Sequence, residues 1–305
     1  MPKATPVIIE AAVNGYPISE NPNRPFGPEA VAADALRCIE AGAAIIHTHV
    51  DPPDMRKPSN ETAENYLAQF SRILAARPDA LVYPTIGSGD TIAERMAHHE
   101  VLVAACGLRI GLIDPGSLNL TTADAEGLPG AGGIVYANSP ADIHYIFGLL
   151  GRLQLGPSMA IYEPTFLRYA LAFYRAGKLP PGALAKFYFG EDYGQSGLGQ
   201  ASYSFGLPPR PWAVDAYLKL LEGYDLPWAV TVLGGDVTEH GLARYALEKG
   251  GHLRVGLEDY AGPNTPSNLE LVEQAVKLAS EVGRPVATPD QAATILGLPR
   301  EAGDR

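Results

Sequence analysis

The sequence predicts a (β/α)8 barrel, also called a TIM barrel, and two observations lead to this fold class. Short apolar runs alternate with helical patterns along almost all of the 305 residues, which is typical of repeated βα units around a parallel sheet. The chain contains eight strand-like runs, and that number favours a closed barrel over an open doubly wound sheet. We therefore predict a single TIM-barrel domain over residues 1–305.

Each predicted strand is an apolar run bounded by turn residues or by the start of a helical pattern. Because the strands of such a barrel are parallel, their carboxyl ends meet at one face, where functional side chains gather. The predicted strands are Val7–Ala12, Ala44–His49, Ala80–Pro84, Gly107–Leu112, Ser158–Tyr162, Ala185–Phe189, Trp228–Leu233 and His252–Gly256.

The predicted helices lie between these runs. The first, Gly27–Ala41, has Pro28 in its first turn and Gly42 after its last residue, positions that favour these two residue types. The stretches 119–140 and 190–211 are long, polar and Gly-rich, so we predict loop insertions there, and a helical extension at the C-terminus. The other predicted helices are Thr62–Ala76, Thr91–Cys106, Pro164–Ala176, Pro211–Glu222, Thr238–Lys249 and Asn268–Val282.

Composition narrows the classes of partner. The formal charge of −11 disfavours nucleic acids and anionic membranes, because both would be repelled by an acidic surface. Cys38 and Cys106 are far apart and form no CxxC motif, so the chain is expected in a reducing cytoplasm. Residues 1–6 lack an apolar signal segment, and no apolar run approaches the ~18 residues that span a membrane. We expect a cytoplasmic protein that acts on small molecules.

The segment Ile45–Val50 contains two histidines, His47 and His49, at the end of an apolar run. Residues i and i+2 of a strand point to the same face, so both imidazoles can reach one metal ion. Imidazole suits zinc, iron or nickel, and two histidines with one carboxylate leave coordination positions open for substrate. The alternative is a pair that only satisfies local hydrogen bonds.

A third metal ligand is expected from the last predicted strand, which lies beside the first two when the barrel closes. Glu258 ends the run Arg254–Asp259 and is our candidate. Arg254 lies four residues before it on the same strand face, and Asp259 can turn towards Arg254. This pair can bind a carboxylate and move a proton beside a divalent cation, although a structural ion pair at the barrel rim is the alternative.

Polar side chains also follow the other predicted strands. We predict that Asn14, Thr85, Ser88 and Asp114 contact substrate, because catalytic groups of a barrel lie at the carboxyl ends of its strands. Three further groups are interpreted more simply. We expect His98 and His99 to face solvent or interact with the helix dipole, and His252 to be structural. The aromatic residues of the third group form either a cover for a ligand or a packing surface for a subunit: Tyr188, Tyr193, Tyr203 and Phe205.

Two motifs are specific in combination, HxH within Glu40–His49 and GGHxRxGxED within Gly250–Asp259. Weaker motifs are found in Ala11–Gly15, Pro115–Asn119, Ser267–Val272 and Ala287–Pro289. Through these motifs the chain resembles, over nearly its full length, the family of β-keto acid cleavage enzymes. The resemblance implies a zinc-dependent TIM barrel, oligomeric as a dimer or tetramer, that joins a β-keto acid to acetyl-CoA and yields acetoacetate and a new CoA thioester. It also implies that His47, His49 and Glu258 hold zinc, and that Arg254 and Asp259 remove the α-proton of the keto acid.

Three positions depart from the family pattern. The family's aminohexanoate enzyme has an acidic residue after the glycine that follows the first strand, where it holds the substrate ammonium; this chain has Tyr16–Pro17. We therefore do not expect a cationic amino substrate such as 3-keto-5-aminohexanoate. Asp51 stands where the family often has arginine, and Asp114 stands where that enzyme has a neutral polar residue. The pocket is thus expected to differ while the metal site is shared.

Two other functions compete with this interpretation. A metal-dependent hydrolase of the amidohydrolase kind also uses HxH in a barrel, but needs further histidine ligands from the middle strands, where this chain offers Glu163 and Glu191. A non-catalytic barrel stabilised by its metal would have a closed site with four protein ligands, whereas an enzyme keeps one position open.

Overall fold

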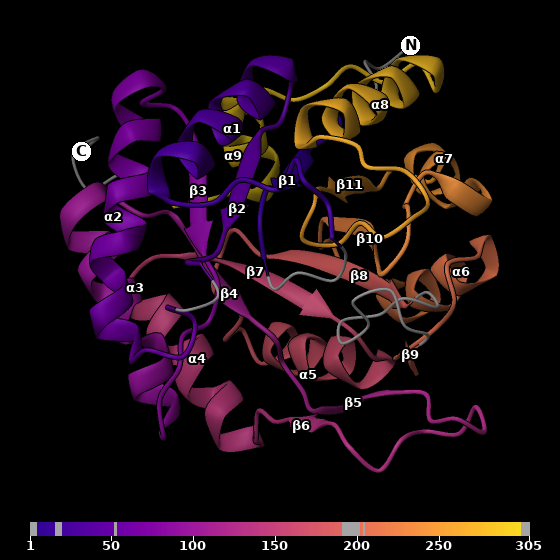
Figure 1. The fold of residues 1–305 in the computed structure, drawn as a ribbon, viewed down its shortest axis with the longest axis horizontal. Helices are drawn as coiled ribbons and strands as arrows, with labels where there is room; N and C mark the ends of the chain where they lie inside the picture. Colours follow the sequence, from indigo (N-terminus) through magenta and orange to yellow (C-terminus); the bar gives the residue numbers. More distant parts are fainter. Residues whose placement is uncertain (1–4, 16–19, 52–53, 191–201, 204, 300–305) are drawn as a thin grey trace.

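The computed structural model describes residues 5–15, 20–51, 54–190, 202–203 and 205–299, in which eight parallel strands form a barrel (Figure 1). The outermost strands of the hydrogen-bonded order, β3 and β4, contact each other, so the ring is nearly closed. The predicted TIM barrel is confirmed. The order is β3 (Leu81–Pro84), β2 (Ile45–Thr48), β1 (Ile9–Ala12), β11 (His252–Val255), β10 (Trp228–Leu233), β8 (Leu184–Gly190), β7 (Gly156–Ile161) and β4 (Ile110–Ile113).

Helices surround the strands, as Figure 1 shows. Every predicted helix is present. The helix predicted over Thr238–Lys249 begins with a 3-10 segment, Glu239–Gly241, in which His240 has a positive φ of 53°. Its α-helical part, α7 (Leu242–Glu248), is therefore shorter than predicted. The helix α4 was missed, although Ser139 and Asp142 form a capping box at its start. The helices are α1 (Pro28–Ala41), α2 (Ser59–Ala76), α3 (Ile92–Cys106), α4 (Pro140–Arg152), α5 (Pro164–Arg175), α6 (Pro211–Leu221), α7 (Leu242–Glu248), α8 (Asn268–Glu281) and α9 (Pro289–Leu296).

A small antiparallel sheet occupies the stretches predicted as loop insertions. It joins β6 (Ile134–Tyr136), β5 (Leu118–Thr122) and β9 (Ser202–Tyr203) in that order. Within the stretch 190–211, residues 191–201 and 204 lie outside the described residues. The β5 and β6 strands run along the lower edge of Figure 1 and bring Leu118 and Tyr136 to the site described below.

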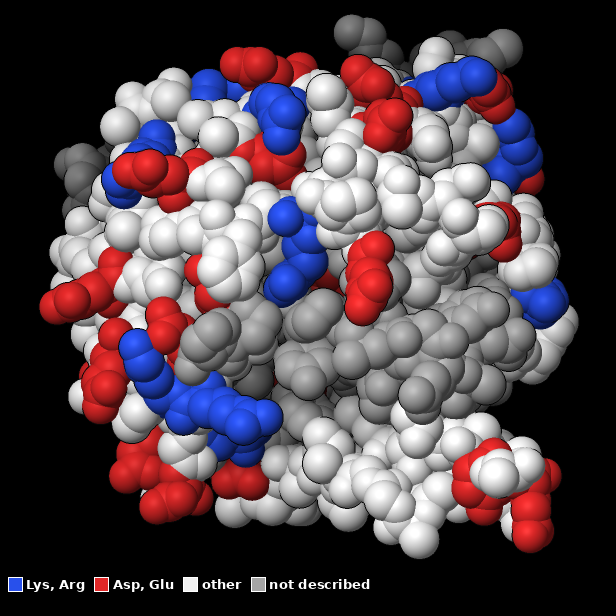
Figure 2. All heavy atoms as spheres, viewed as in Figure 1, with Lys and Arg blue, Asp and Glu red and all other residues white. Residues whose placement is uncertain are grey.

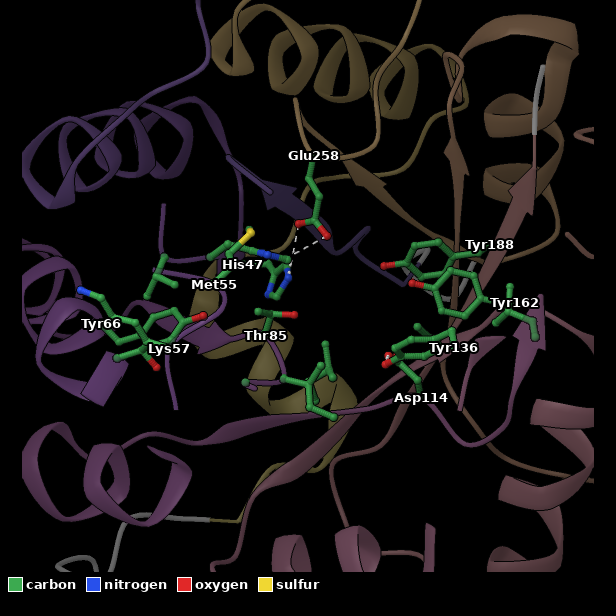
Figure 3. Close-up of a pocket in the computed structure, with 18 residues that line it drawn as sticks. His47, Met55, Lys57, Tyr66, Thr85, Asp114, Tyr136, Tyr162, Tyr188 and Glu258 are labelled. Carbon is green, nitrogen blue, oxygen red and sulfur yellow. Dashed lines mark hydrogen bonds and ion pairs between the residues drawn. The ribbon is translucent and has the colours of Figure 1, made fainter. Parts of the chain in front are cut away.

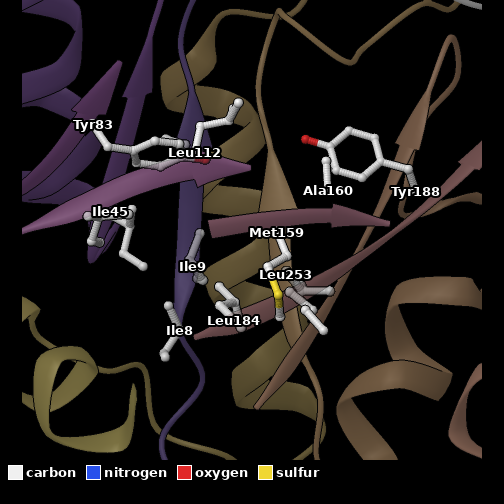
Figure 4. Close-up of a cluster of buried hydrophobic side chains, with 14 of the residues drawn as sticks. Ile8, Ile9, Ile45, Tyr83, Leu112, Met159, Ala160, Leu184, Tyr188 and Leu253 are labelled. Atoms are coloured by element: carbon white, nitrogen blue, oxygen red, sulfur yellow. The ribbon is translucent and has the colours of Figure 1, made fainter. Parts of the chain in front are cut away.

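The barrel interior is filled by alternate side chains of the strands, because successive residues of a strand point to opposite faces. Apolar side chains from β1, β2, β4, β7, β8 and β11 meet in one buried cluster (Figure 4). Each fully buried aliphatic side chain contributes about 1.5–3 kcal/mol relative to an exposed one. In register with this cluster, Glu10 on β1 pairs with Arg254 on β11, so the interior also contains charged groups.

The surface carries both signs of charge. On the face in Figure 2, basic side chains lie mostly beside acidic ones, and several pairs are in contact, such as Arg72 with Glu29 and Lys219 with Glu222. In the described part of the chain, no helix combines the length and the apolar character needed to cross a bilayer.

Candidate metal and substrate-binding site

His47, His49 and Glu258 come together at the carboxyl end of the barrel. His47 lies in β2, His49 just beyond it, and Glu258 follows β11; these strands flank β1 on its two sides. The Nε2 atom of His47 is 3.3 Å from Oε2 of Glu258, and the Nε2 atom of His49 is 3.2 Å from Oε1 (Figure 3). One ligand atom from each residue lies within 4.8 Å of the others. This spacing permits all three to bind a single metal ion.

The surroundings of the two imidazoles orient them for this task. The Nδ1 atom of His47 donates to the carbonyl oxygen of Tyr83 over 3.2 Å, which leaves its Nε2 lone pair towards Glu258. Asn14 fixes the main chain of His49: its Oδ1 accepts from the His49 N–H at 2.9 Å, and its Nδ2 donates to the His49 carbonyl oxygen at 3.1 Å. Such outer contacts fix the ring orientation of metal-binding histidines.

The electrostatics of the three groups also fit a metal. Burial holds the pKa of His47 well below its usual range, so the ring is neutral and can act as a ligand. Burial alone would raise the pKa of Glu258, but Arg254 and the two imidazoles outweigh it and hold that pKa well below its usual range. Its Oε2 atom is buried and accepts no hydrogen bond from the described residues. An ionised carboxylate with a spare oxygen beside two imidazoles is a donor set that suits zinc.

Glycine residues allow the chain to bring Glu258 into place. Gly256 has a φ of +136°, and a Cβ atom there would lie 2.1 Å from the carbonyl oxygen of Ala12. Only glycine tolerates both this conformation and this approach. Gly15 packs against the Glu258 side chain itself, since a Cβ at Gly15 would lie 2.3 Å from Cγ of Glu258. The turn after β11 therefore depends on both glycines.

Arg254 lies behind Glu258 and is completely buried. It contacts Oε1 of Glu258 at 2.9 Å and donates from Nη1 to Oε1 of Glu10 at 2.7 Å. It also donates from Nε and Nη2 to the two oxygens of Asp259, at 2.7 and 3.0 Å. The expected contact between Arg254 and Asp259 is present. Thr231 donates to Asp259 as well, while burial, opposed by Arg254, raises the pKa of this carboxyl.

Lys186 is a functional candidate that sequence reasoning missed. It lies in β8 with no exposed surface, and its Nζ donates to Oε1 of Glu10 at 3.1 Å and to the hydroxyl of Tyr83 at 2.7 Å. Burial lowers its pKa although Glu10 opposes the shift. The available signal was a lone lysine inside an apolar strand, because a buried lysine requires a partner.

A cavity of about 200 Å³ opens beside the metal-ligand group. Of the residues predicted to contact substrate, Thr85 and Asp114 line it. Asn14 and Ser88 are not among its described lining residues: Asn14 holds His49, and Ser88 donates to the Met55 carbonyl oxygen. Arg254 and Asp259 also lie behind the wall. Further lining residues include Tyr66, Tyr136, Tyr162 and Tyr188. Of these, only Tyr188, which lies in β8, was among the aromatic residues predicted to cover a ligand.

His98 and His99 correct another expectation. Both are fully buried in α3 rather than solvent-facing, because α3 packs against α2 with that part of its surface. The Nε2 atom of His98 donates to the carbonyl oxygen of Thr85 at 2.8 Å, and its ring stacks on Tyr66. His98 thereby supports two residues of the cavity wall. His252, as expected, is structural: its Nδ1 accepts from the N–H of Ile8 at 3.0 Å.

Comparison with known proteins places the chain in a family. A family model described as beta-keto acid cleavage enzyme matches residues 6–298. The chain is 28% identical over 300 residues to the 3-keto-5-aminohexanoate cleavage enzyme of Fusobacterium nucleatum subsp. nucleatum, covering 96% of this chain and 98% of that protein. It is also 28% identical to the 3-oxoadipate:acetyl-CoA acetyltransferase of Cupriavidus necator, covering 96% and 95%.

The fold is likewise shared with solved structures. The structure described as "Ternary complex of ObcA with C4-CoA adduct and oxalate" superposes with a TM-score of 0.68 at 16% identity, covering 91% of this chain and 68% of that one. A likeness at this identity concerns the barrel. The family itself is fixed by the match along the sequence: the chain belongs to the beta-keto acid cleavage enzymes.

Proposed function

We propose that the protein is a zinc-dependent enzyme that condenses a β-keto acid with acetyl-CoA and releases acetoacetate and a new acyl-CoA. The observation that carries this proposal is the convergence of His47, His49 and Glu258 at the wall of a cavity. Relatives whose names include acetyl-CoA as co-substrate, such as the acetyltransferase of Cupriavidus necator and the 3,5-dioxohexanoate:acetyl-CoA acetone transferase of Paraburkholderia graminis, support the choice of thioester.

The reaction balances without an added oxidant or reductant. A base removes a proton from C2 of the keto acid, and the carbanion attacks the acetyl carbonyl carbon while CoA leaves as thiolate. The thiolate then attacks the original keto carbon, the bond between that carbon and C2 breaks, and C2 recovers its proton. A divalent metal, when bound, polarises the keto oxygen and stabilises the negative charge that develops there.

Two residues of the chain have proposed roles in the proton transfer. Asp259 is the proposed base, and Arg254 holds its carboxylate in place while keeping Glu258 ionised. The raised pKa of Asp259 supports this role, because a more basic carboxylate accepts a proton more readily. Asp259 lies behind the cavity wall, so the role requires its carboxyl to turn towards the cavity when substrate is bound.

The competing functions make different demands on the site. A purely structural zinc has four protein ligands, whereas the metal-binding group among the described residues contains three. An amidohydrolase-type site uses additional histidines, and this group contains only His47 and His49. Both comparisons favour an open catalytic position.

The test uses the purified protein loaded with zinc, a panel of β-keto acids and acetyl-CoA, with acetoacetate and acyl-CoA identified by mass spectrometry. Dialysis against a chelator should abolish product formation, and zinc should restore it. Glu258→Gln should bind no zinc and form no product, while Glu222→Gln, which alters an exposed carboxylate that pairs with Lys219, should behave as wild type. Full activity in metal-free protein would overturn the proposal.

We also propose that the protein is a cytoplasmic homo-oligomer, a dimer or tetramer. Large apolar side chains on the arm formed by β5, β6 and the residues between them (118–136) support self-association. Leu128, Ile134 and Val135 are 55%, 63% and 68% exposed. Sedimentation equilibrium of the wild type and of Val135→Glu tests this point. A monomeric wild type would contradict it.

A further inference from the structure

One side of the cavity is unlike the metal-ligand side. Figure 3 shows Asp114, Tyr136, Tyr162 and Tyr188 together on one flank, with His47 and Glu258 separated from them by open space. All of these residues line the same cavity. A substrate held at the metal ligands by its carboxylate and keto group would extend its side chain into this space, so the flank is placed to recognise that side chain.

Asp114 is the charged member of the flank. The residue is 5% exposed, and its Oδ2 accepts a hydrogen bond from the hydroxyl of Tyr136. Its main-chain oxygen accepts from Nδ2 of Asn138 at 2.9 Å. The remaining atom, Oδ1, is buried and has no hydrogen-bond partner among the described residues. A buried carboxylate oxygen without a donor is costly, so a ligand that supplies a donor would be stabilised here.

The charges around the cavity point to the nature of that donor. Asp114 and Glu258 are the carboxylates among its described lining residues, and Lys57 is the only lysine or arginine there. Lys57 pairs with Asp54 at 2.6 Å, and Glu258 contacts the two imidazoles and Arg254. Among the described residues, the side chain of Asp114 has the hydroxyl of Tyr136 as its partner and forms no ion pair. A cationic substrate side chain would supply the opposite charge.

The tyrosines complete a site for an ammonium group. Tyr162 and Tyr188 have ring centroids 4.6 Å apart, and Figure 3 shows their hydroxyls pointing into the cavity. A primary ammonium has three N–H donors, which Oδ1 of Asp114 and the phenolic oxygens can accept. Aromatic walls also stabilise a neighbouring cation. A carboxylate-bearing side chain would instead face Asp114 with a like charge.

We propose that the substrate is a β-keto acid whose side chain ends in an ammonium group, and that Asp114 binds this group. The inference rests on the proposed function, since it uses the metal ligands to place the other end of the substrate. It departs from the expectation, drawn from Tyr16–Pro17, that the substrate carries no cationic amino group. That expectation concerns the end of the first strand, whereas Asp114 follows β4 and would meet a cation at another position of the side chain.

Matched substrates test the proposal directly. The first pair is 5-amino-3-oxopentanoate and 3-oxohexanoate, in which an ammonium replaces a methyl group; the second pair, 6-amino-3-oxohexanoate and 3-oxoheptanoate, is one carbon longer. 3-Oxoadipate serves as the anionic probe. With zinc-loaded protein and saturating acetyl-CoA, we expect kcat/KM to favour the ammonium member of at least one pair by about 100-fold, because a site built to hydrogen-bond a group rejects an analogue that lacks it.

Two variants assign the preference to Asp114. Asp114→Asn keeps an oxygen that can accept from Tyr136 but removes the charge, and should lower the ammonium-to-methyl ratio of kcat/KM by at least about 30-fold. Asp225→Asn makes the same chemical change at an exposed site near the opposite end of the barrel and should preserve the ratio. Isothermal titration calorimetry without acetyl-CoA should show that Asp114→Asn also binds the two amino-substituted keto acids of the panel more weakly. Thermal unfolding and zinc content verify that each variant is folded and loaded.

The outcomes separate the two proposals. If no keto acid gives acetoacetate, the proposed function is wrong. If keto acids react but the methyl member or 3-oxoadipate is preferred, or if Asp114→Asn retains the ammonium preference, the function stands and the ammonium site is wrong.

Discussion

Glu10 and Arg254 form an ion pair of 2.7 Å inside the barrel, and both side chains are shielded from solvent. Their Cα atoms are register partners in the neighbouring strands β1 and β11. Glu10 also accepts from Lys186, so one carboxylate compensates two buried cations. Burial opposes ionisation of Glu10, but Lys186 and Arg254 lower its pKa to about 2. This carboxylate therefore links the barrel core to the Arg254 contacts with Glu258 and Asp259.

Replacing Glu10 by glutamine should destabilise the protein strongly. The amide keeps the shape but leaves two buried cations with less compensation, and breaking a buried pair costs about 3–5 kcal/mol. Urea unfolding measures this change. Glu222→Gln, in a pair whose side chains are 75% and 64% exposed, should change the unfolding free energy by less than about 1 kcal/mol. Equal small effects in the two variants would show that the buried pair is not important for stability.

Asn14→Ala should weaken zinc binding without removing a ligand. The variant loses both hydrogen bonds to the His49 main chain, and loss of such supporting contacts typically costs 10- to 100-fold, roughly, in metal affinity. Competition with a chromophoric chelator gives the affinity. Asn23→Ala, which removes an exposed bond to the Thr265 carbonyl oxygen, serves as control. Unchanged affinity in Asn14→Ala would contradict a positioning role.

Gly15→Ala should displace Glu258. The added methyl group would lie 2.3 Å from Cγ of Glu258, and a contact this close forces the ligand to move. We expect a fall in zinc affinity of at least about tenfold, since metal binding depends on ligand geometry. Gly148→Ala places a methyl group in α4 with no heavy atom nearer than 4.0 Å and should be neutral or slightly stabilising. Tight zinc binding in Gly15→Ala would refute the packing argument.

His252 should make stability depend on pH at a site remote from the cavity. Burial, assisted by Arg284, lowers its pKa to about 3, whereas an unfolded histidine titrates near 6.5. Between these values the unfolded state binds a proton that the folded state does not, so the contribution is fully present above about pH 6.5 and is lost as pH falls towards 3.

The comparison with His252→Asn isolates this effect. An asparagine oxygen can accept from the N–H of Ile8 in place of Nδ1 but does not titrate. From pH 7 to 4.5 the unfolding free energy of the wild type should fall by about 2.5 kcal/mol more than that of the variant. Parallel pH profiles in denaturant unfolding would show that His252 has the same pKa in the folded and unfolded protein, which would contradict the prediction.

The predicted strands and helices follow from periodicity, because apolar runs and helical patterns are local properties of the sequence. The helix α4 was not predicted, because its capping box directly follows a long polar stretch. The positions of His47, His49 and Glu258 were also predictable, since the barrel rule places strand ends at one face. Tyr136 gave no such signal: it belongs to the short strand β6, and only the fold of that arm brings it to Asp114.

The sequence by itself determined the barrel, the three candidate metal ligands and the partnership of Arg254 with Asp259. Only the tertiary structure decided which polar residues reach the cavity. Asn14 and Ser88 are engaged by main-chain groups, and Lys186 is bonded inside the barrel. The physical reason is that strand periodicity decides the face to which a side chain points. Its hydrogen-bond partner, by contrast, is supplied by segments that are distant in the chain. For Asp114, which lines the cavity, that difference leaves one buried carboxylate oxygen without a hydrogen-bond partner among the described residues.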